Sequence, residues 1–228
     1  MTSITSRAYR CAVLAGVCLW LSGAPSGFAQ TTGTAAQTPA ATAEDIIGKL
    51  QQGGYVVYIR HTQTDSATKD GDLSDLSDCS KQRILSKTGR EDAVKLGEAL
   101  KAVKLPADPV LTSQFCRAKE TAKLMGFESA IETPDINSDN GEPVVSKEES
   151  QRRAAALRKL LATPTAAGKN TVIVGHVPNI REAAGKDYDS MKEGEIAVFA
   201  PKQCEPGYYA AGRVTPDALK TLAQTASK

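Results

Sequence analysis

Apolar residues are grouped along the chain in two ways, as short runs and as longer stretches with helical spacing. Short apolar and β-branched runs predict strands; they cover residues 55–59, 108–112, 171–174, 196–199 and 208–214. Apolar positions three or four apart predict helices; these cover residues 43–50, 87–103, 117–125 and 147–162, and Pro216 is placed to begin another. Because strands and helices alternate, we expect an α/β fold, a single domain with a mostly parallel sheet and helices on both faces.

The first 29 residues differ from the rest of the chain. Arg7 and Arg10 precede the apolar run 11–21, and small residues follow up to Ala29. This order is typical of a secretory signal peptide. The run is shorter than the roughly 20 residues that span a bilayer, which disfavours the alternative of a retained membrane anchor. We therefore expect a periplasmic or secreted protein with no stable membrane insertion after signal cleavage.

Two further regions have no periodic pattern. Residues 30–43 are rich in Thr, Ala, Gln and Gly, which predicts a flexible linker. This leaves residues 44–228 as the folded domain. Within that domain, residues 133–145 predict a loop or lid.

Charge and cysteine content narrow the possible partners. The formal net charge of +2 falls to zero once the segment carrying Arg7 and Arg10 is removed, so no basic excess favours nucleic acid. Three cysteines lie beyond that segment: Cys79, Cys116 and Cys204. In an oxidising compartment one pair can form a disulfide, and the sequence leaves open which pair it is.

The candidate chemistry centres on the two histidines of the chain. His61 and His176 each follow a predicted buried strand directly. The carboxyl ends of strands in an open α/β sheet form ligand sites, so the two imidazoles can meet across one crevice. Arg60 precedes His61, and Arg117 lies near the start of a helix that follows another strand. Two guanidiniums and two imidazoles make a pocket suited to phosphate.

These residues lie in motifs that resemble a known family. Residues 60–64, Arg-His-Thr-Gln-Thr, look like the Arg-His-Gly-x-Thr signature of the histidine phosphatase superfamily, with Thr62 in place of Gly. Residues 113–122 resemble its Ser-x-x-x-Arg-Ala-x-x-Thr-Ala segment, and residues 175–179 its second-histidine motif. Residues 85–90 match a helix lead-in that is common in the family. The ordered set resembles small secreted bacterial members of the phosphoglycerate-mutase-like branch.

The resemblance implies a metal-independent phosphatase that needs no cofactor. His61 would attack phosphorus and carry the phosphoryl group as phosphohistidine before water releases it. Arg60, Arg117 and His176 would bind the substrate and neutralise charge on its non-bridging oxygens. Thr64 would either donate a hydrogen bond to the phosphate or cap the loop. The expected partner is a phosphorylated small molecule or an envelope phosphate, with the ester or anhydride itself left open.

The proton donor for the leaving group is not fixed by the sequence. In relatives it is a carboxylic acid after the second-arginine helix, or an Asp directly after the second histidine. Val177 follows His176 here, so Asp65, Asp135 and Glu142 remain as candidates. Thr62 also predicts less room beside His61 than glycine would leave.

Other classes of protein are less well supported. A metal site on the two histidines would need a further ligand beside repelling arginines. No cysteine is followed by Arg at the sixth position, which argues against a cysteine-nucleophile phosphatase, and no Walker A motif or Gly-x-Ser-x-Gly elbow is present. A phosphosugar mutase is disfavoured by the predicted export. A catalytically weak phospho-ligand binding or sensing protein with the same pocket remains the alternative function.

Overall fold

The computed structural model describes residues 41–139 and 144–226. The predicted signal peptide (1–29) lies outside these residues, as does most of the predicted linker (30–43). Within the described ranges, no helix combines the length and the apolar character that a bilayer span needs.

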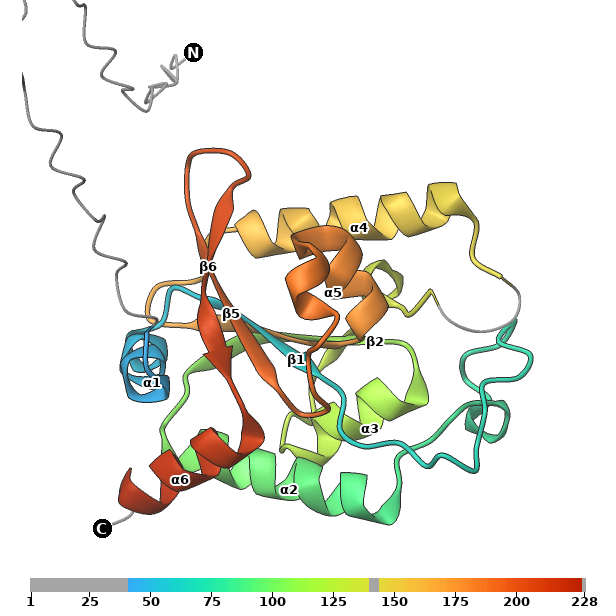
Figure 1. The fold of residues 1–228 in the computed structure, drawn as a ribbon, viewed down its shortest axis with the longest axis horizontal. Helices are drawn as coiled ribbons and strands as arrows, with labels where there is room; N and C mark the ends of the chain where they lie inside the picture. The colour runs from blue at the N-terminus through green and yellow to red at the C-terminus, as the bar shows by residue number, and fades with distance from the viewer. Residues whose placement is uncertain (1–40, 140–143, 227–228) are drawn as a thin grey trace, which may run out of the picture. The chain divides into compact units, whose positions relative to one another are not determined.

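A single sheet of six strands lies at the centre of the described fold (Figure 1). The strands are β1 (Val56–Arg60), β2 (Ala107–Ser113), β3 (Ile131–Thr133), β4 (Asn170–Gly175), β5 (Ile196–Pro201) and β6 (Tyr208–Val214). Their order across the sheet is β3-β2-β4-β1-β5-β6. The first four strands in that order are parallel, and β5 and β6 are antiparallel to their neighbours. The predicted α/β fold with a mostly parallel sheet is confirmed.

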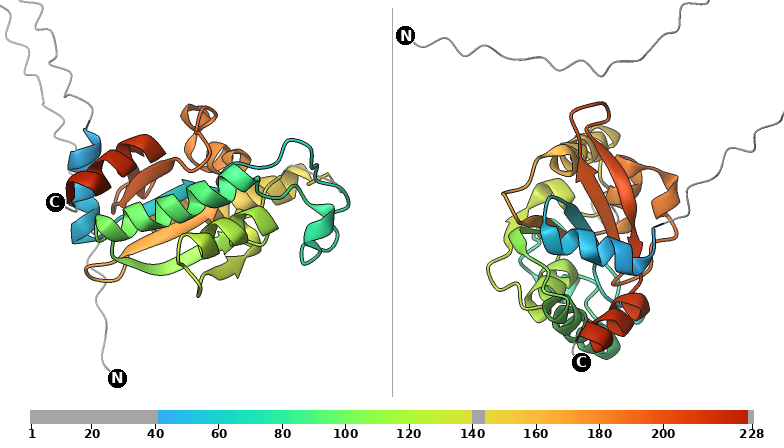
Figure 2. Two further views of the ribbon diagram at one scale, coloured as in Figure 1. Left: turned by 90° about the horizontal axis from the view of Figure 1, so that it is seen from below. Right: turned by 90° about the vertical axis from the view of Figure 1, so that its left-hand side faces the viewer.

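Helices pack on both faces of this sheet, as predicted. They are α1 (Ala43–Gln52), α2 (Lys87–Ala102), α3 (Cys116–Leu124), α4 (Lys147–Ala162), α5 (Val177–Ala184) and α6 (Pro216–Ala226). Figure 1 shows α4 and α5 on one side of the sheet and α2, α3 and α6 on the other. The view from below in Figure 2 shows α2 and α6 in front of the strands.

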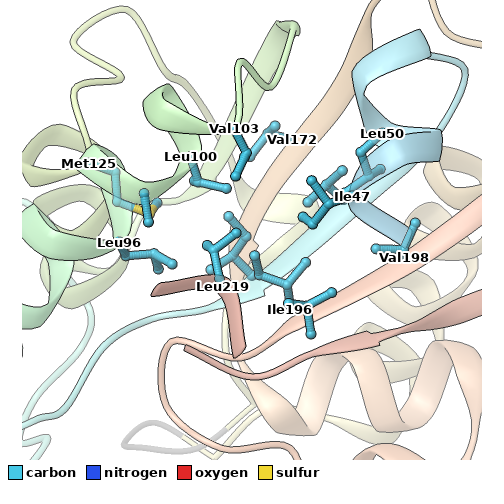
Figure 3. Packing of buried hydrophobic residues seen from close by; sticks show 14 of the residues in the cluster. Ile47, Leu50, Leu96, Leu100, Val103, Met125, Val172, Ile196, Val198 and Leu219 are labelled. Atoms are coloured by element: carbon cyan, nitrogen blue, oxygen red, sulfur yellow. The ribbon is translucent and has the colours of Figure 1, made fainter. Parts of the chain in front are cut away.

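The two faces of the sheet carry separate apolar cores. Neighbouring residues of a strand point to opposite faces, so Val57 and Ile59 of β1 join a cluster with α1, α2, α3 and α6 (Figure 3). Val56 and Tyr58 join the cluster formed with α4 and α5. Burial on both faces is the reason that β1 reads as a continuous apolar run rather than as an alternating one.

The observed elements differ from the predicted ones in short segments. α4 has the predicted bounds, whereas α5 and β3 were not predicted because eight and three residues give too little pattern to recognise. The region 133–145, predicted as a loop or lid, holds the last residue of β3 and a 3₁₀ helix, η2 (Pro134–Ile136). Its residues 140–143 lie outside the described part of the chain.

Candidate active site

The strand register brings His61 and His176 together. β1 and β4 are parallel neighbours, and Arg60 of β1 is paired with Gly175 of β4. The residue that follows each strand is a histidine, and the ring centroids of His61 and His176 are 5.2 Å apart. β2 lies on the other side of β4 and ends at Ser113, so its carboxyl end reaches the same edge. The meeting of both imidazoles in one crevice was predicted from the strand ends, and the geometry agrees.

His61 and His176 line a hollow of about 320 Å³ at that edge of the sheet. The first residues of α5 also line it, so this helix presents its amino-terminal end, which favours anions. The lining residues are Arg60, His61, Arg83, Arg117, Ser138, His176, Val177, Pro178 and Asp189. Four of the predicted site residues, Arg60, His61, Arg117 and His176, are therefore in one place.

The hydrogen bonding of His61 fixes which ring nitrogen can act as a nucleophile. His61 is only 3% exposed, and its Nδ1 lies 2.8 Å from the carbonyl oxygen of Thr62. A carbonyl oxygen can only accept, so Nδ1 carries the hydrogen and Nε2 keeps the lone pair. Burial, followed by the positive charge of Arg117, lowers the pKa of His61 to about 3. At neutral pH the imidazole is therefore unprotonated on Nε2, as attack on phosphorus requires.

A chain of hydrogen bonds orients His176. Its Nε2 lies 2.9 Å from Oγ of Ser113, and that hydroxyl donates to Oδ1 of Asn137 at 3.0 Å. Because the Ser113 proton is used in this way, Nε2 of His176 is the donor and Nδ1 is left without a hydrogen in the neutral ring. Burial, with Arg117 as the next cause, holds the pKa of His176 well below its ordinary value. An anion beside Nδ1 would favour protonation and turn this nitrogen into a donor.

Arg117 is the most deeply buried cation of the site. It is 1% exposed, and its Nη1 donates to Oδ1 of Asp70 at 2.9 Å. Its guanidinium also lies over the ring of Phe115, with Cζ 4.5 Å from the centroid. Burial lowers the pKa of Arg117 to about 10, while Asp70 acts in the opposite direction. The guanidinium is thus charged at neutral pH and held in one orientation.

Arg60 and Arg83 complete the cationic lining. Nη1 of Arg60 donates to the carbonyl oxygen of Met191 at 2.6 Å, which fixes its guanidinium against the segment before β5. Arg83 was not predicted as a site residue. It lies in the long loop between β1 and α2, two residues before the lead-in motif at 85–90, and that proximity was the available signal.

Several nitrogens around the hollow have no hydrogen-bond partner within residues 41–139 and 144–226. They are Nδ1 of His176 and the Nε atoms of Arg60, Arg83 and Arg117, all of them buried. Buried polar atoms without partners are rare and costly, so their grouping points to a ligand. Three guanidinium donors and one imidazole suit a tetrahedral oxyanion such as phosphate.

The two threonines of the signature have different surroundings. Thr64 forms an isolated antiparallel bridge with Leu85 and is not among the residues that line the hollow. Its binding to substrate stays a prediction. Thr62, expected to narrow the space beside His61, directs its hydroxyl to Oγ1 of Thr121 at 3.2 Å and lines a different hollow. The side chain at this position therefore does not take space from the hollow that contains His61.

The carboxylates proposed as proton donors do not line the pocket where they are described. Asp135 makes an ion pair with Arg152 at 2.5 Å, and Asp65 accepts from the amide of Ala67 at 2.9 Å. Glu142 lies outside the described residues. Asp189, which no sequence pattern indicated, lines the hollow itself. It follows the 3₁₀ helix η3 (Lys186–Tyr188), in a segment with no recognisable pattern.

A disulfide joins Cys79 to Cys116, which is one of the pairs that the sequence left open. Cys116 is the first residue of α3 and precedes Arg117. Within the described ranges, no three His, Cys, Asp or Glu side chains are grouped as a metal ion would need.

Comparison with known proteins supports the same family that the motifs resemble. Residues 56–141 match the model of the histidine phosphatase superfamily (branch 1). This match includes His61 and Arg117 and ends before His176. No curated protein matches the chain.

Solved structures show the fold of the chain. The structure of a protein histidine phosphatase, SixA, complexed with tungstate is 19% identical in sequence, with a TM-score of 0.51. The match covers 72% of this chain and 99% of the SixA chain. A phosphoserine phosphatase mutant from Entamoeba histolytica in complex with phosphoserine is 14% identical, with a TM-score of 0.51, covering 72% and 98%. A mycobacterial glucosyl-3-phosphoglycerate phosphatase is 15% identical, with a TM-score of 0.50, covering 69% and 97%. The chain thus has the fold of these phosphatases, and its residues 56–141 match the histidine phosphatase superfamily, branch 1.

Proposed function

We propose that this protein is a metal-independent phosphatase that hydrolyses a phosphomonoester or phosphoanhydride through a phosphohistidine on His61. The observation that carries the proposal is the set of partnerless nitrogens on Arg60, Arg83, Arg117 and His176 around the hollow that contains His61. A phosphoryl group seated there has donors for its non-bridging oxygens and a nucleophile beside it. The predicted signal peptide extends the proposal to a site of action outside the cytoplasm.

In the first step, Nε2 of His61 attacks phosphorus as the bond to the leaving oxygen breaks. Nδ1 stays hydrogen-bonded to the carbonyl oxygen of Thr62, which keeps the ring in the attacking tautomer. The guanidiniums and His176 neutralise charge on the equatorial oxygens, which is where phosphoryl transfer gains most of its rate. Asp189 is the lining carboxylate that would protonate the leaving group.

In the second step, water attacks the phosphohistidine and gives a proton to the Asp189 carboxylate that the first step left, and the bond between phosphorus and Nε2 breaks. Inorganic phosphate is released, and His61 returns to its neutral form. Binding of the anionic substrate favours protonation of His176 at Nδ1, so this ring becomes a donor only when phosphate is present. The positive charge that a metal ion supplies in other phosphatases comes here from three arginines.

The structural relatives act on different substrates. They include a protein histidine phosphatase, a phosphoserine phosphatase and a glucosyl-3-phosphoglycerate phosphatase. These names support a phosphatase in general and favour no one substrate. The proposal is therefore limited to the reaction and its intermediate.

The test compares wild-type protein with His61→Asn on p-nitrophenyl phosphate in the presence of EDTA. We expect turnover and an acid-labile phosphoprotein in the wild type and neither in the variant. Circular dichroism should show that both proteins are folded. Lys87→Ala, an exposed change on α2, serves as the matched control and should match the wild type. Turnover that persists in His61→Asn would rule out the phosphohistidine. Phosphate binding without turnover in the wild type would instead favour a phospho-ligand binding protein.

A further inference from the structure

The loop between β1 and α2 is fastened to the amino-terminal end of α3. This loop (residues 61–86, teal in Figure 1) contains Cys79, whose disulfide to Cys116 joins residues 37 positions apart. It also contains Gln82, which is 2% exposed. Oε1 of Gln82 accepts from the amide of Cys116 at 2.9 Å, and its Nε2 donates to the carbonyl oxygen of Leu76 at 2.9 Å.

The side chain of Gln82 takes the place of a local helix cap. The first amides of a helix have no partner within it and need an acceptor. Phe115, at the N-cap of α3, makes no side-chain cap hydrogen bond. Gln82 supplies that acceptor from a segment 34 residues away. The disulfide and this buried hydrogen bond therefore both join the loop to the end of the helix.

Each of the two joined positions is followed directly by an arginine of the phosphate hollow. Arg83 follows Gln82, and Arg117 follows Cys116. Oδ1 of Asp70 accepts from the backbone amide of Arg83 and from Nη1 of Arg117, both at 2.9 Å. The connection therefore fixes the backbone of Arg83 relative to the guanidinium of Arg117, and both arginines line the same hollow.

This spacing has to be held against electrostatic repulsion. The charge of Arg83 lowers the pKa of Arg117, which means that the two cations are close enough to repel. Arg117 is held by its helix and by burial, whereas Arg83 belongs to a loop that has little regular secondary structure. Without a cross-link, ordering this loop around phosphate would cost conformational entropy at each binding event.

We infer that Cys79, Cys116 and Gln82 are positioning residues that hold Arg83 in the phosphate hollow, so that phosphate affinity depends on the disulfide. The inference rests on the proposed function only for the identity of the ligand as a phosphoryl group. Opening the disulfide gives two thiols, and the reductant dithiothreitol is oxidised to its cyclic disulfide in the same exchange. The reduced protein keeps its nucleophile and Arg117 but loses the fixed position of Arg83.

The experiment measures binding of inorganic phosphate by calorimetry, which needs no turnover. We expect reduction of the wild type, or the double change Cys79→Ala with Cys116→Ala, to weaken phosphate binding about tenfold, the effect of one charge-assisted hydrogen bond. Arg83→Gln should weaken it by a similar factor. If the disulfide acts through Arg83, its removal from Arg83→Gln should add little further loss.

Two controls separate positioning from general stability. Dithiothreitol should leave the affinity of the double-alanine variant unchanged, which excludes an effect through other cysteines. Gln82→Leu, which keeps the disulfide, should also weaken phosphate binding, and thermal unfolding of every variant reports whether the fold persists at the assay temperature. Equal losses from disulfide removal with and without Arg83, or an affinity that does not respond to reduction, would overturn the inference. A redox-dependent affinity in a protein without turnover would leave the inference standing and reject the proposed phosphatase.

Discussion

The hydroxyl group of Tyr58 makes two hydrogen bonds to the backbone of His176. It donates to the carbonyl oxygen at 2.9 Å and accepts from the amide at 2.8 Å. Tyr58 lies in β1 and is fully buried. A Cβ atom at position 175 would collide with the hydroxyl of Tyr58, so only glycine fits there. The position of the second histidine is thus set from the strand that carries the first.

Tyr58→Phe is expected to lower the free energy of unfolding by about 1–3 kcal/mol, because it leaves the buried amide of His176 without a partner. The carbonyl oxygen of His176 then keeps only the hydrogen bond from the amide of Ile180 at 3.3 Å. Urea unfolding followed by circular dichroism measures this loss. Turnover should also fall, since the backbone that carries His176 is released. Tyr209→Phe is the matched control, because Tyr209 is 52% exposed. Equal stability of the two variants would mean that the hydroxyl of Tyr58 does not hold His176.

Buried neutral histidines predict that the protein loses stability in mild acid. The pKa of His61 is about 3 in the folded state and about 6.5 when unfolded, and that of His176 is lowered in the same direction. Between these values the unfolded chain binds more protons than the folded one, so the free energy of unfolding falls as pH drops below 6.5. His61 contributes about 1.4 kcal/mol per pH unit in this window, and His176 acts in the same direction.

Carboxylates also titrate in mild acid, so the effect of His61 is measured as a difference. Urea unfolding of the wild type and of His61→Asn at pH 7.0, 6.0 and 5.0 should give a stability difference that changes by about 1.4 kcal/mol per unit below 6.5. The variant should have the shallower pH dependence. Parallel curves for the two proteins would show that His61 is not held neutral by burial.

The sequence predicted most of the scaffold because the main elements carry strong periodic or continuous patterns. α4 has the predicted bounds, and the buried strands β1 and β4 were recognised from apolar runs. α5 was missed because its eight residues follow His176 directly, so its apolar face is too short to show a period. The elements that were not predicted are too short to show a pattern, whereas the alternation of strands and helices was predicted correctly.

The candidate site was predicted as far as it depends on strand ends. His61, His176, Arg60 and Arg117 are each placed by an element that the sequence reveals. Arg83, Asp70 and Asp189 lie in segments without periodicity, and only tertiary contacts bring them to the hollow. The hydrogen bond from Nε2 of His176 to Ser113 depends on the register between β2 and β4, which a single sequence does not specify.

Asp189 gives the final prediction, because a proton donor acts most strongly when the leaving group is a poor one. p-Nitrophenolate leaves readily without a proton, whereas an alkoxide needs one as the bond to phosphorus breaks. Asp189→Asn should therefore lower kcat/KM about 100-fold for a simple alkyl phosphate and less than about 10-fold for p-nitrophenyl phosphate. Asp135→Asn, which removes a carboxylate paired with Arg152 away from the pocket, should change neither. Equal losses on both substrates would assign Asp189 a role in binding or in orienting the substrate, and would leave the leaving group to take its proton from water.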